Sequence, residues 1–244
     1  MAGAALGDVS AARVLQARIE LALGNPAAAL AAVKKVLPQA PADSGALCAV
    51  ARAQLALGQP GVARIFAARA AQADPFDPEP LLVKAEIARA SNEPAAELAA
   101  LQAAVDVDPE SSRAQLALGR ALHERGRSDA ALNALEDSAE LDPSSYAAAL
   151  LFGQALAAAK QKQPAMEALA RAVALAPRAA DPHYELAVLK LDGDGDAQGA
   201  LAEAKLFLSL SSEPPPPGHP IHALVQRCEE ALKQAAQASV VQTR

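Results

Sequence analysis

The fold is decided by a segment near the middle of the chain. Residues 112–145 read SRAQLALGRALHERGRSDAALNALEDSAELDPSS. Leucine and alanine recur at helical spacing on both sides of an Arg-Gly-Arg-Ser turn at 125–128, and Pro143 follows the second apolar stretch. Proline ends a helix because it lacks a backbone N–H and restricts the residue before it. The segment therefore predicts a helix, a turn, a second helix and a closing proline.

This pattern recurs along the chain with a step of 34 residues. Prolines stand at positions 41, 75, 109, 143 and 177, and one column holds only small residues: Ala17, Ala51, Ala85, Gly119, Gly153 and Ala187. A fixed period of this length is the signature of a repeat architecture. Small residues at one period allow the two helices of each hairpin to pack closely. The sequence thus predicts a stack of helical hairpins.

On these residues the chain resembles the tetratricopeptide repeat (TPR) family, whose unit is a helix–turn–helix of 34 residues. The resemblance implies an all-α fold, a right-handed superhelix whose inner wall is built from the first helix of each repeat. Repeat six departs from the pattern by one inserted residue in the segment 192–196. We expect a flexible N-terminus at 1–9, six repeats at 10–43, 44–77, 78–111, 112–145, 146–179 and 180–213, a proline-rich connector at 214–220, a capping helix at 221–238, and a tail at 239–244.

Composition and charge exclude several classes of protein. The 244 residues are 52% hydrophobic but only 2% aromatic, and the net charge is −6. A nucleic-acid partner is not expected, because the chain has neither a basic stripe nor stacking aromatic residues. Direct membrane insertion is not expected either, since no apolar stretch is long enough. Met1 is not followed by a secretory signal, so we expect a cytoplasmic protein, or a periplasmic or lipid-anchored one if a leader has been removed.

The sequence shows no catalytic, cofactor-binding or metal-binding apparatus, which favours a non-enzymatic protein. Its histidines and cysteines fall into no known motif: His123, His183, His219, His222, Cys48 and Cys228. Oxygen ligands at calcium-loop spacing occur at Asp192, Asp194, Asp196 and Glu203, but Ala197 stands where that loop needs glycine. An inserted turn is the favoured interpretation, and calcium binding stays open.

The resemblance also places three columns of residues on the inner wall. One column is apolar, the next carries arginines, and the third is mixed. Together they predict a groove for a helix or extended segment that bears acidic and apolar residues. The alternative is that part of the leucine stripe packs against neighbouring helices. The predicted groove comprises Val14, Arg18, Leu21, Cys48, Arg52, Leu55, Leu82, Glu86, Arg89, Leu116, Arg120, His123, Leu150, Gln154 and Tyr184.

The predicted function is that of an adaptor, a scaffold that recruits another protein or peptide segment into a multi-protein complex. Some TPR proteins clamp the terminal carboxylate of chaperone tails, but only one of the five matching positions here could serve: Val14, Arg18, Ala49, Glu79 and Val83. One alternative is a membrane-associated assembly factor similar to the pilotin lipoproteins of type IV pilus secretins. Those carry a lipidated cysteine near the mature N-terminus, whereas no cysteine precedes Cys48. Another alternative is the TPR portion of a larger protein.

Overall fold

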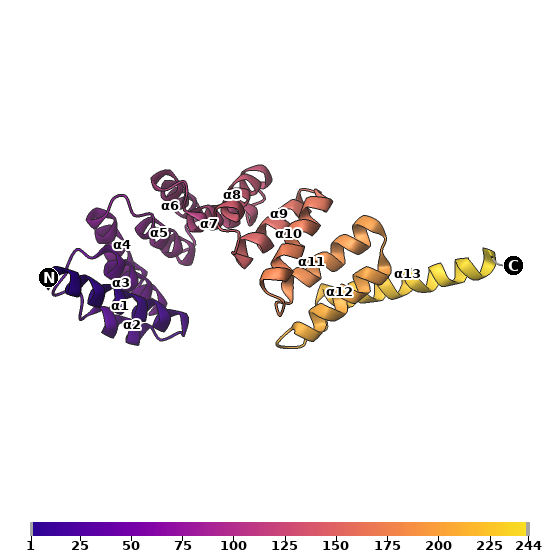
Figure 1. Ribbon diagram of the computed structural model, residues 1–244, viewed down its shortest axis with the longest axis horizontal. Helices are drawn as coiled ribbons and strands as arrows, with labels where there is room; N and C mark the ends of the chain where they lie inside the picture. The colour runs from indigo at the N-terminus through magenta and orange to yellow at the C-terminus, as the bar shows by residue number, and fades with distance from the viewer. Residues whose placement is uncertain (1, 243–244) are drawn as a thin grey trace. The chain divides into compact units, whose positions relative to one another are not determined.

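A computed structural model describes residues 2–242, with the side chains of residues 10–193 and 195–237. These residues form helices and turns without a strand, which confirms the all-α prediction (Figure 1). The chain divides into two compact units, Met1–Ala121 and Leu122–Arg244. The helices are α1 (Ala2–Ala22), α2 (Pro26–Val33), α3 (Ser44–Ala56), α4 (Pro60–Ala73), α5 (Glu79–Ala90), α6 (Pro94–Val107), α7 (Ser112–His123), α8 (Ser128–Leu141), α9 (Tyr146–Ala158), α10 (Lys162–Leu175), α11 (Asp181–Leu189), α12 (Ala197–Leu210) and α13 (Pro220–Gln242).

The N-terminal unit is built from hairpins with a core of small side chains. Helices α1 and α2, α3 and α4, and α5 and α6 pair as hairpins, and each hairpin packs on the next. Ala17 and Ala51 of the predicted small column are fully buried. Proline stands at the start of α2, α4 and α6, where its missing N–H removes no helical hydrogen bond. Alanine at the contacts therefore brings the helices close together, and proline sets where each second helix begins.

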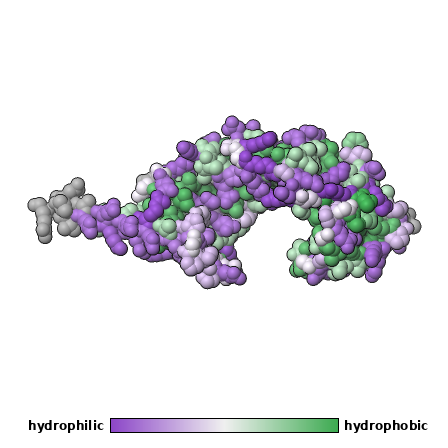
Figure 2. Space-filling view, turned by 180° about the vertical axis from the view of Figure 1, so that it is seen from behind, coloured by the Kyte–Doolittle hydropathy of each residue, from purple (hydrophilic) through white to green (hydrophobic). Residues whose placement is uncertain are grey.

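The C-terminal unit repeats this packing in helices α8 to α12. Gly153 of α9 shows why the column must be small: a Cβ atom there would lie 2.7 Å from Cγ of Leu169 in α10. Helix α13 buries Ile221, Leu224 and Cys228 against α11 and α12. The first part of α13 thus covers the last hairpin of the unit, as a capping helix does in a stacked repeat. The part of α13 that follows this contact, up to residue 237, has a mainly hydrophilic surface (Figure 2).

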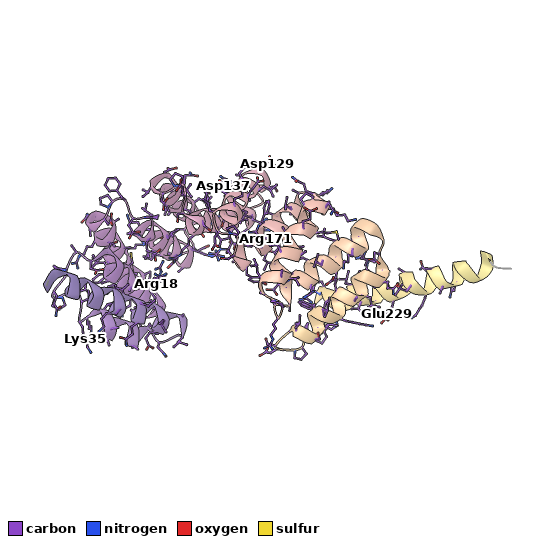
Figure 3. The ribbon with its side chains drawn as sticks, in the orientation of Figure 1. Arg18, Lys35, Asp129, Asp137, Arg171 and Glu229 are labelled. Carbon is purple, nitrogen blue, oxygen red and sulfur yellow. The ribbon has the colours of Figure 1, made fainter. Side chains whose placement is uncertain are left out.

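Arginine side chains fasten some hairpins to the turn before them. Arg171 of α10 donates a hydrogen bond of 2.7 Å to the carbonyl oxygen of Pro143 (Figure 3). In the N-terminal unit, Arg69 of α4 makes the equivalent contact with the carbonyl of Pro41 at 3.4 Å. The four residues occupy matching repeat positions, so one interaction recurs at the predicted period. Asp137, labelled in Figure 3, holds the same repeat position and cannot donate this bond.

Two helices extend into segments expected to lie outside the helical repeats, and repeat six contains a wider turn. Helix α1 begins at Ala2 and includes residues 2–9 of the expected flexible N-terminus, because this alanine-rich segment contains no proline to stop it. Helix α13 continues to Gln242 through most of the expected tail; Met1 and residues 243–244 lie outside the described residues. The inserted residue of repeat six forms a π-helical turn at Lys190–Asp194, followed by Gly195 with a φ of 66°. A π-turn accommodates one extra residue without ending the helix abruptly.

Candidate partner-binding groove

A cavity of about 240 Å³ opens between α5, α6 and α7 of the N-terminal unit. Five predicted groove residues line it: Leu82, Glu86, Arg89, Leu116 and Arg120. The structure adds five residues that the sequence pattern did not assign to the groove: Ala85, Glu97, Leu101, Arg113 and Ala117. The repeat register therefore brings together residues from two first helices, and α6 contributes a second helix to the wall.

Apolar residues from three helices form the floor of this cavity. Leu82 and Leu101 are buried, and Leu116 and Ala117 are half-buried. Alanine at position 117 leaves space that a larger side chain would fill. The floor offers leucine surface that an apolar side chain of a bound segment can contact. Binding cavities are commonly lined by apolar residues in this way.

Arg52, predicted to be a partner-binding cation, is already paired within the chain. Its guanidinium group donates two hydrogen bonds of 2.8 Å to Glu86 and forms an ion pair with Glu79. Glu79 is shared with Arg113 at 2.6 Å, so four side chains form one network across α3, α5 and α7. Burial opposes ionisation of Glu79, but Arg52 and Arg113 outweigh it and hold the pKa of its carboxyl below its usual range. The network therefore stabilises the hairpin stack and leaves Arg52 no free charge.

Arg120 lines the cavity and is available to a bound partner. Among the residues that the structure describes, it has no ion-pair or hydrogen-bond partner, and its side chain is exposed. Arg89 lies 3.9 Å from Glu97, whose side chain is buried. The rim of the cavity thus combines paired charges with one unpaired guanidinium group above an apolar floor.

A second cavity, of about 300 Å³, holds four more predicted groove residues in the same unit: Val14, Arg18, Cys48 and Arg52. Arg18 is exposed on α1 without a partner among the described residues (Figure 3). Burial raises the pKa of the Cys48 thiol to about 12, so the thiol stays protonated and packs as a small apolar group. Leu21 and Leu55 are half-buried and pack against the core, which agrees with the alternative interpretation of the leucine stripe.

The other predicted residues, His123, Leu150, Gln154 and Tyr184, lie in the C-terminal unit, where Gln154 and Tyr184 contact neighbouring elements. Gln154 donates a hydrogen bond of 3.0 Å to Glu185. Burial raises the pKa of Glu185 and the charge of Asp181 adds to this, while the hydrogen bond from Gln154 and the nearby His123 oppose it. The ring of Tyr184 packs against Phe207 and His219, with centroids 5.6 and 5.7 Å away. Leu150 is half-buried on α9.

Three of the four carboxylates at calcium-loop spacing have separate partners. Asp192 pairs with Arg227, and Asp196 accepts a hydrogen bond from the backbone N–H of Gly199 as the N-cap of α12. Glu203 lies within α12, where it contacts Lys190 at 2.6 Å and His183 at 2.7 Å. The side chain of Asp194 lies outside the described ones. No cluster of three or more potential metal ligands occurs among the residues with described positions.

The chain belongs to the tetratricopeptide repeat family. The family model described as tetratricopeptide repeat matches residues 14–78, 82–146 and 124–180, which is more than half of the chain. An array of this family is a scaffold for protein–protein interactions, and its repeats are in general not catalytic. No described helix is both long and apolar enough to cross a membrane.

Solved structures of other proteins share this fold at low sequence identity. PilF of Pseudomonas aeruginosa is 18% identical with a TM-score of 0.72, over 93% of this chain and 99% of PilF. YrrB, described as a TPR protein with an unusual peptide-binding site, is 17% identical with a TM-score of 0.62, over 81% of this chain and 97% of YrrB. A fragment of MamA from Desulfovibrio magneticus RS-1, from residue 41 to its end, is 22% identical with a TM-score of 0.60, over 68% of this chain and 94% of the fragment. Among curated proteins, none is a significant match. At these identities the similarities establish the fold alone.

Proposed function

We propose that this chain is a non-enzymatic adaptor that binds a partner polypeptide at the cavity between α5, α6 and α7. The observation that carries the proposal is the combination of an apolar floor with the unpaired Arg120 at its rim. An acidic side chain of the partner forms a charge-assisted hydrogen bond with this guanidinium group. An apolar side chain one helical turn away fills the space beside Leu82 and Leu116.

The ion-pair network of Arg52, Glu79, Glu86 and Arg113 restricts the charge of a partner segment that fits the cavity. Glu86 and Arg113 are already committed to partners within the chain, so neither supplies a strong free charge. One acidic residue next to apolar residues therefore fits better than a run of acidic residues. The partner we propose is a short amphipathic segment with a single carboxylate facing Arg120.

A displayed library of random peptides tests this proposal and reads out the chemistry of the bound segment directly. The wild-type chain should enrich peptides that carry Asp or Glu beside leucine-like residues, and Arg120→Glu should lose them. Arg178→Glu is the matched control, because Arg178 is also exposed and unpaired among the described residues but lies in the other unit. Equal enrichment by all three proteins would refute the assignment of the cavity.

A membrane-associated assembly factor similar to pilotins is the second candidate. It is supported by the similarity in length and fold to PilF, which spans nearly all of both chains. Labelling cells that express the complete native gene with a radioactive fatty acid separates the two candidates, since a lipidated product supports the pilotin-like role. A longer gene product would instead favour the third alternative, the TPR portion of a larger protein. The cytoplasmic location stays a prediction until such an experiment is done.

A further inference from the structure

The first helix exposes an apolar stripe on its outer side. Leu15 and Ile19 of α1, and Leu23 directly after its last residue, are 58%, 52% and 68% exposed. Residues four apart lie on the same side of a helix, so the three side chains form one continuous stripe. Hydrophobic surface also gathers on this N-terminal unit in Figure 2. Exposed leucine and isoleucine in a row mark an interaction surface more often than scattered single residues do.

The repeat register shows what covers the same face in the next hairpin. One period on, the positions of Leu15 and Ile19 are held by Ala49 and Ala53 of α3, which are 2% and 0% exposed. These alanines belong to a core cluster with three residues of the preceding helix α2: Ala29, Ala32 and Val33. In the second hairpin this face is therefore buried under a helix. The stripe on α1 has the geometry to receive a helix in the same way.

Charged residues beside the stripe are complementary to the same residues in a second copy. Arg13 and Glu20 lie together on one flank of the stripe, and Leu15 and Ile19 lie two residues on either side of Ala17. A twofold axis at the level of Ala17 sets two α1 helices antiparallel. It brings Leu15 of each copy to Ile19 of the other, and Arg13 of each copy beside Glu20 of the other. Such a self-complementary patch is what a twofold interface requires.

The present contacts of these two charges are weak enough to exchange. Arg13 donates a hydrogen bond of 3.0 Å to Gln16 on its own helix, and Glu20 accepts one of 3.2 Å from Asn25, both at the exposed surface. Exposed polar contacts of this kind contribute little stability. On the other flank, Arg18 lines the second cavity beside α3 and lies outside the stripe.

We propose that α1 pairs antiparallel with α1 of a second copy, so that the chain forms a twofold dimer through Leu15, Ile19 and Leu23. The occupant is a second copy because the stripe and its flanking charges complement themselves. The larger side chains of Leu15 and Ile19, in place of Ala49 and Ala53 of α3, suit two such helices packed at the ordinary interhelical distance of about 8–10 Å. This interface is separate from the cavity at Arg120.

Sedimentation velocity on the purified full chain over a wide concentration range tests the proposal. The wild type should dimerise, and Leu15→Arg should raise the dissociation constant by about 30-fold or more, the effect of losing a central interface residue. Leu206→Arg is the matched control, since Leu206 is an exposed leucine in the other unit, and it should dimerise like the wild type. A wild type that stays monomeric, or a Leu15→Arg variant that dimerises normally, would overturn the proposal.

A charge exchange distinguishes this twofold pairing from any other use of the stripe. Arg13→Glu alone and Glu20→Arg alone should each weaken the dimer, because each places like charges together. The double variant restores opposite charges across the twofold axis and should recover the wild-type affinity. Single variants that weaken the dimer without recovery in the double variant would overturn the antiparallel arrangement. Circular dichroism on every variant checks that helical content is unchanged.

Discussion

Replacing Arg52 with glutamine tests whether its ion-pair network holds the first hairpins together. Only 15% of the Arg52 side chain is exposed, and its charge lies against Glu79 and Glu86. Removing one partner of a fully buried ion pair costs about 3–5 kcal/mol, because the other charge is left in a poorly solvated site. Glu86 is 40% exposed and Glu79 keeps Arg113, so we expect a smaller loss of about 2 kcal/mol in the free energy of unfolding.

The matched control is Arg64→Gln in the same unit. Arg64 pairs with Glu93 at 2.6 Å, but the two side chains are 50% and 45% exposed. Exposed pairs contribute about 0–1 kcal/mol, so this variant should unfold nearly like the wild type. Urea unfolding followed by circular dichroism measures both changes. Equal losses in the two variants would refute the reasoning that burial gives the Arg52 network its strength.

The ion-pair network also makes the destabilisation caused by Arg52→Gln depend on pH. The pKa of Glu79 is lower in the folded chain than in the unfolded chain, so its ionisation stabilises the fold at neutral pH. This contribution is lost as the pH falls through the folded pKa of Glu79. The difference in stability between the wild type and Arg52→Gln should therefore shrink towards acid pH. A difference that stays constant from neutral to acid pH would show that the lost interaction is not ionic.

Burial and close packing give three further predictions. Gly153→Ala should destabilise the C-terminal unit by about 1–3 kcal/mol through overpacking, measured by urea unfolding. Gly61→Ala is the control: no atom lies within 4 Å of the new Cβ, so this variant should not destabilise the chain. Glu185→Gln should raise the melting temperature at neutral pH, because the raised pKa of Glu185 means that its charge destabilises the fold. The gain in melting temperature should vanish at acid pH, where Glu185 is protonated. A variant less stable than the wild type at neutral pH would contradict this prediction. Cys48, with its pKa raised to about 12, should react with a thiol reagent only after denaturant is added, and rapid reaction in the native chain would show that it is accessible.

The hairpin architecture could be predicted from sequence because packing restricts single positions. Gly153 has to be small since Leu169 fills the space beside it, and that requirement leaves a visible residue type at a fixed period. Prolines at the starts of the second helices are visible for a similar reason. The helix ends at 2–9 and 239–242 could not be placed so well, because alanine-rich sequence permits a helix without marking where it stops.

The charge arrangement at the candidate groove was harder to predict. Arg52 and Glu86 stand one period apart in the same column, so their pairing follows from the register once neighbouring hairpins are stacked. Considered one residue at a time, however, the arginines resemble free groups for a partner. Arg113 and Glu79 are also one period apart, and applying the register to pairs of opposite charge would have found both contacts. Arg120 has no such counterpart among the described residues, since position 154 holds glutamine and position 86 is already paired.

The π-helical turn at Lys190–Asp194 absorbs the one-residue insertion of repeat six, so that the following helix is not shifted. Ala165 and Ala200 are both fully buried at the hairpin contact, although 35 residues separate them and the other steps are 34. The wider turn takes up the additional residue before α12 begins, so the helix after it resumes the phase of the earlier repeats. A solenoid with such a turn can gain a residue and still keep Ala200 and Ala204 of the next helix in the core. Deletion of Gly193 would accordingly be a return to the standard unit.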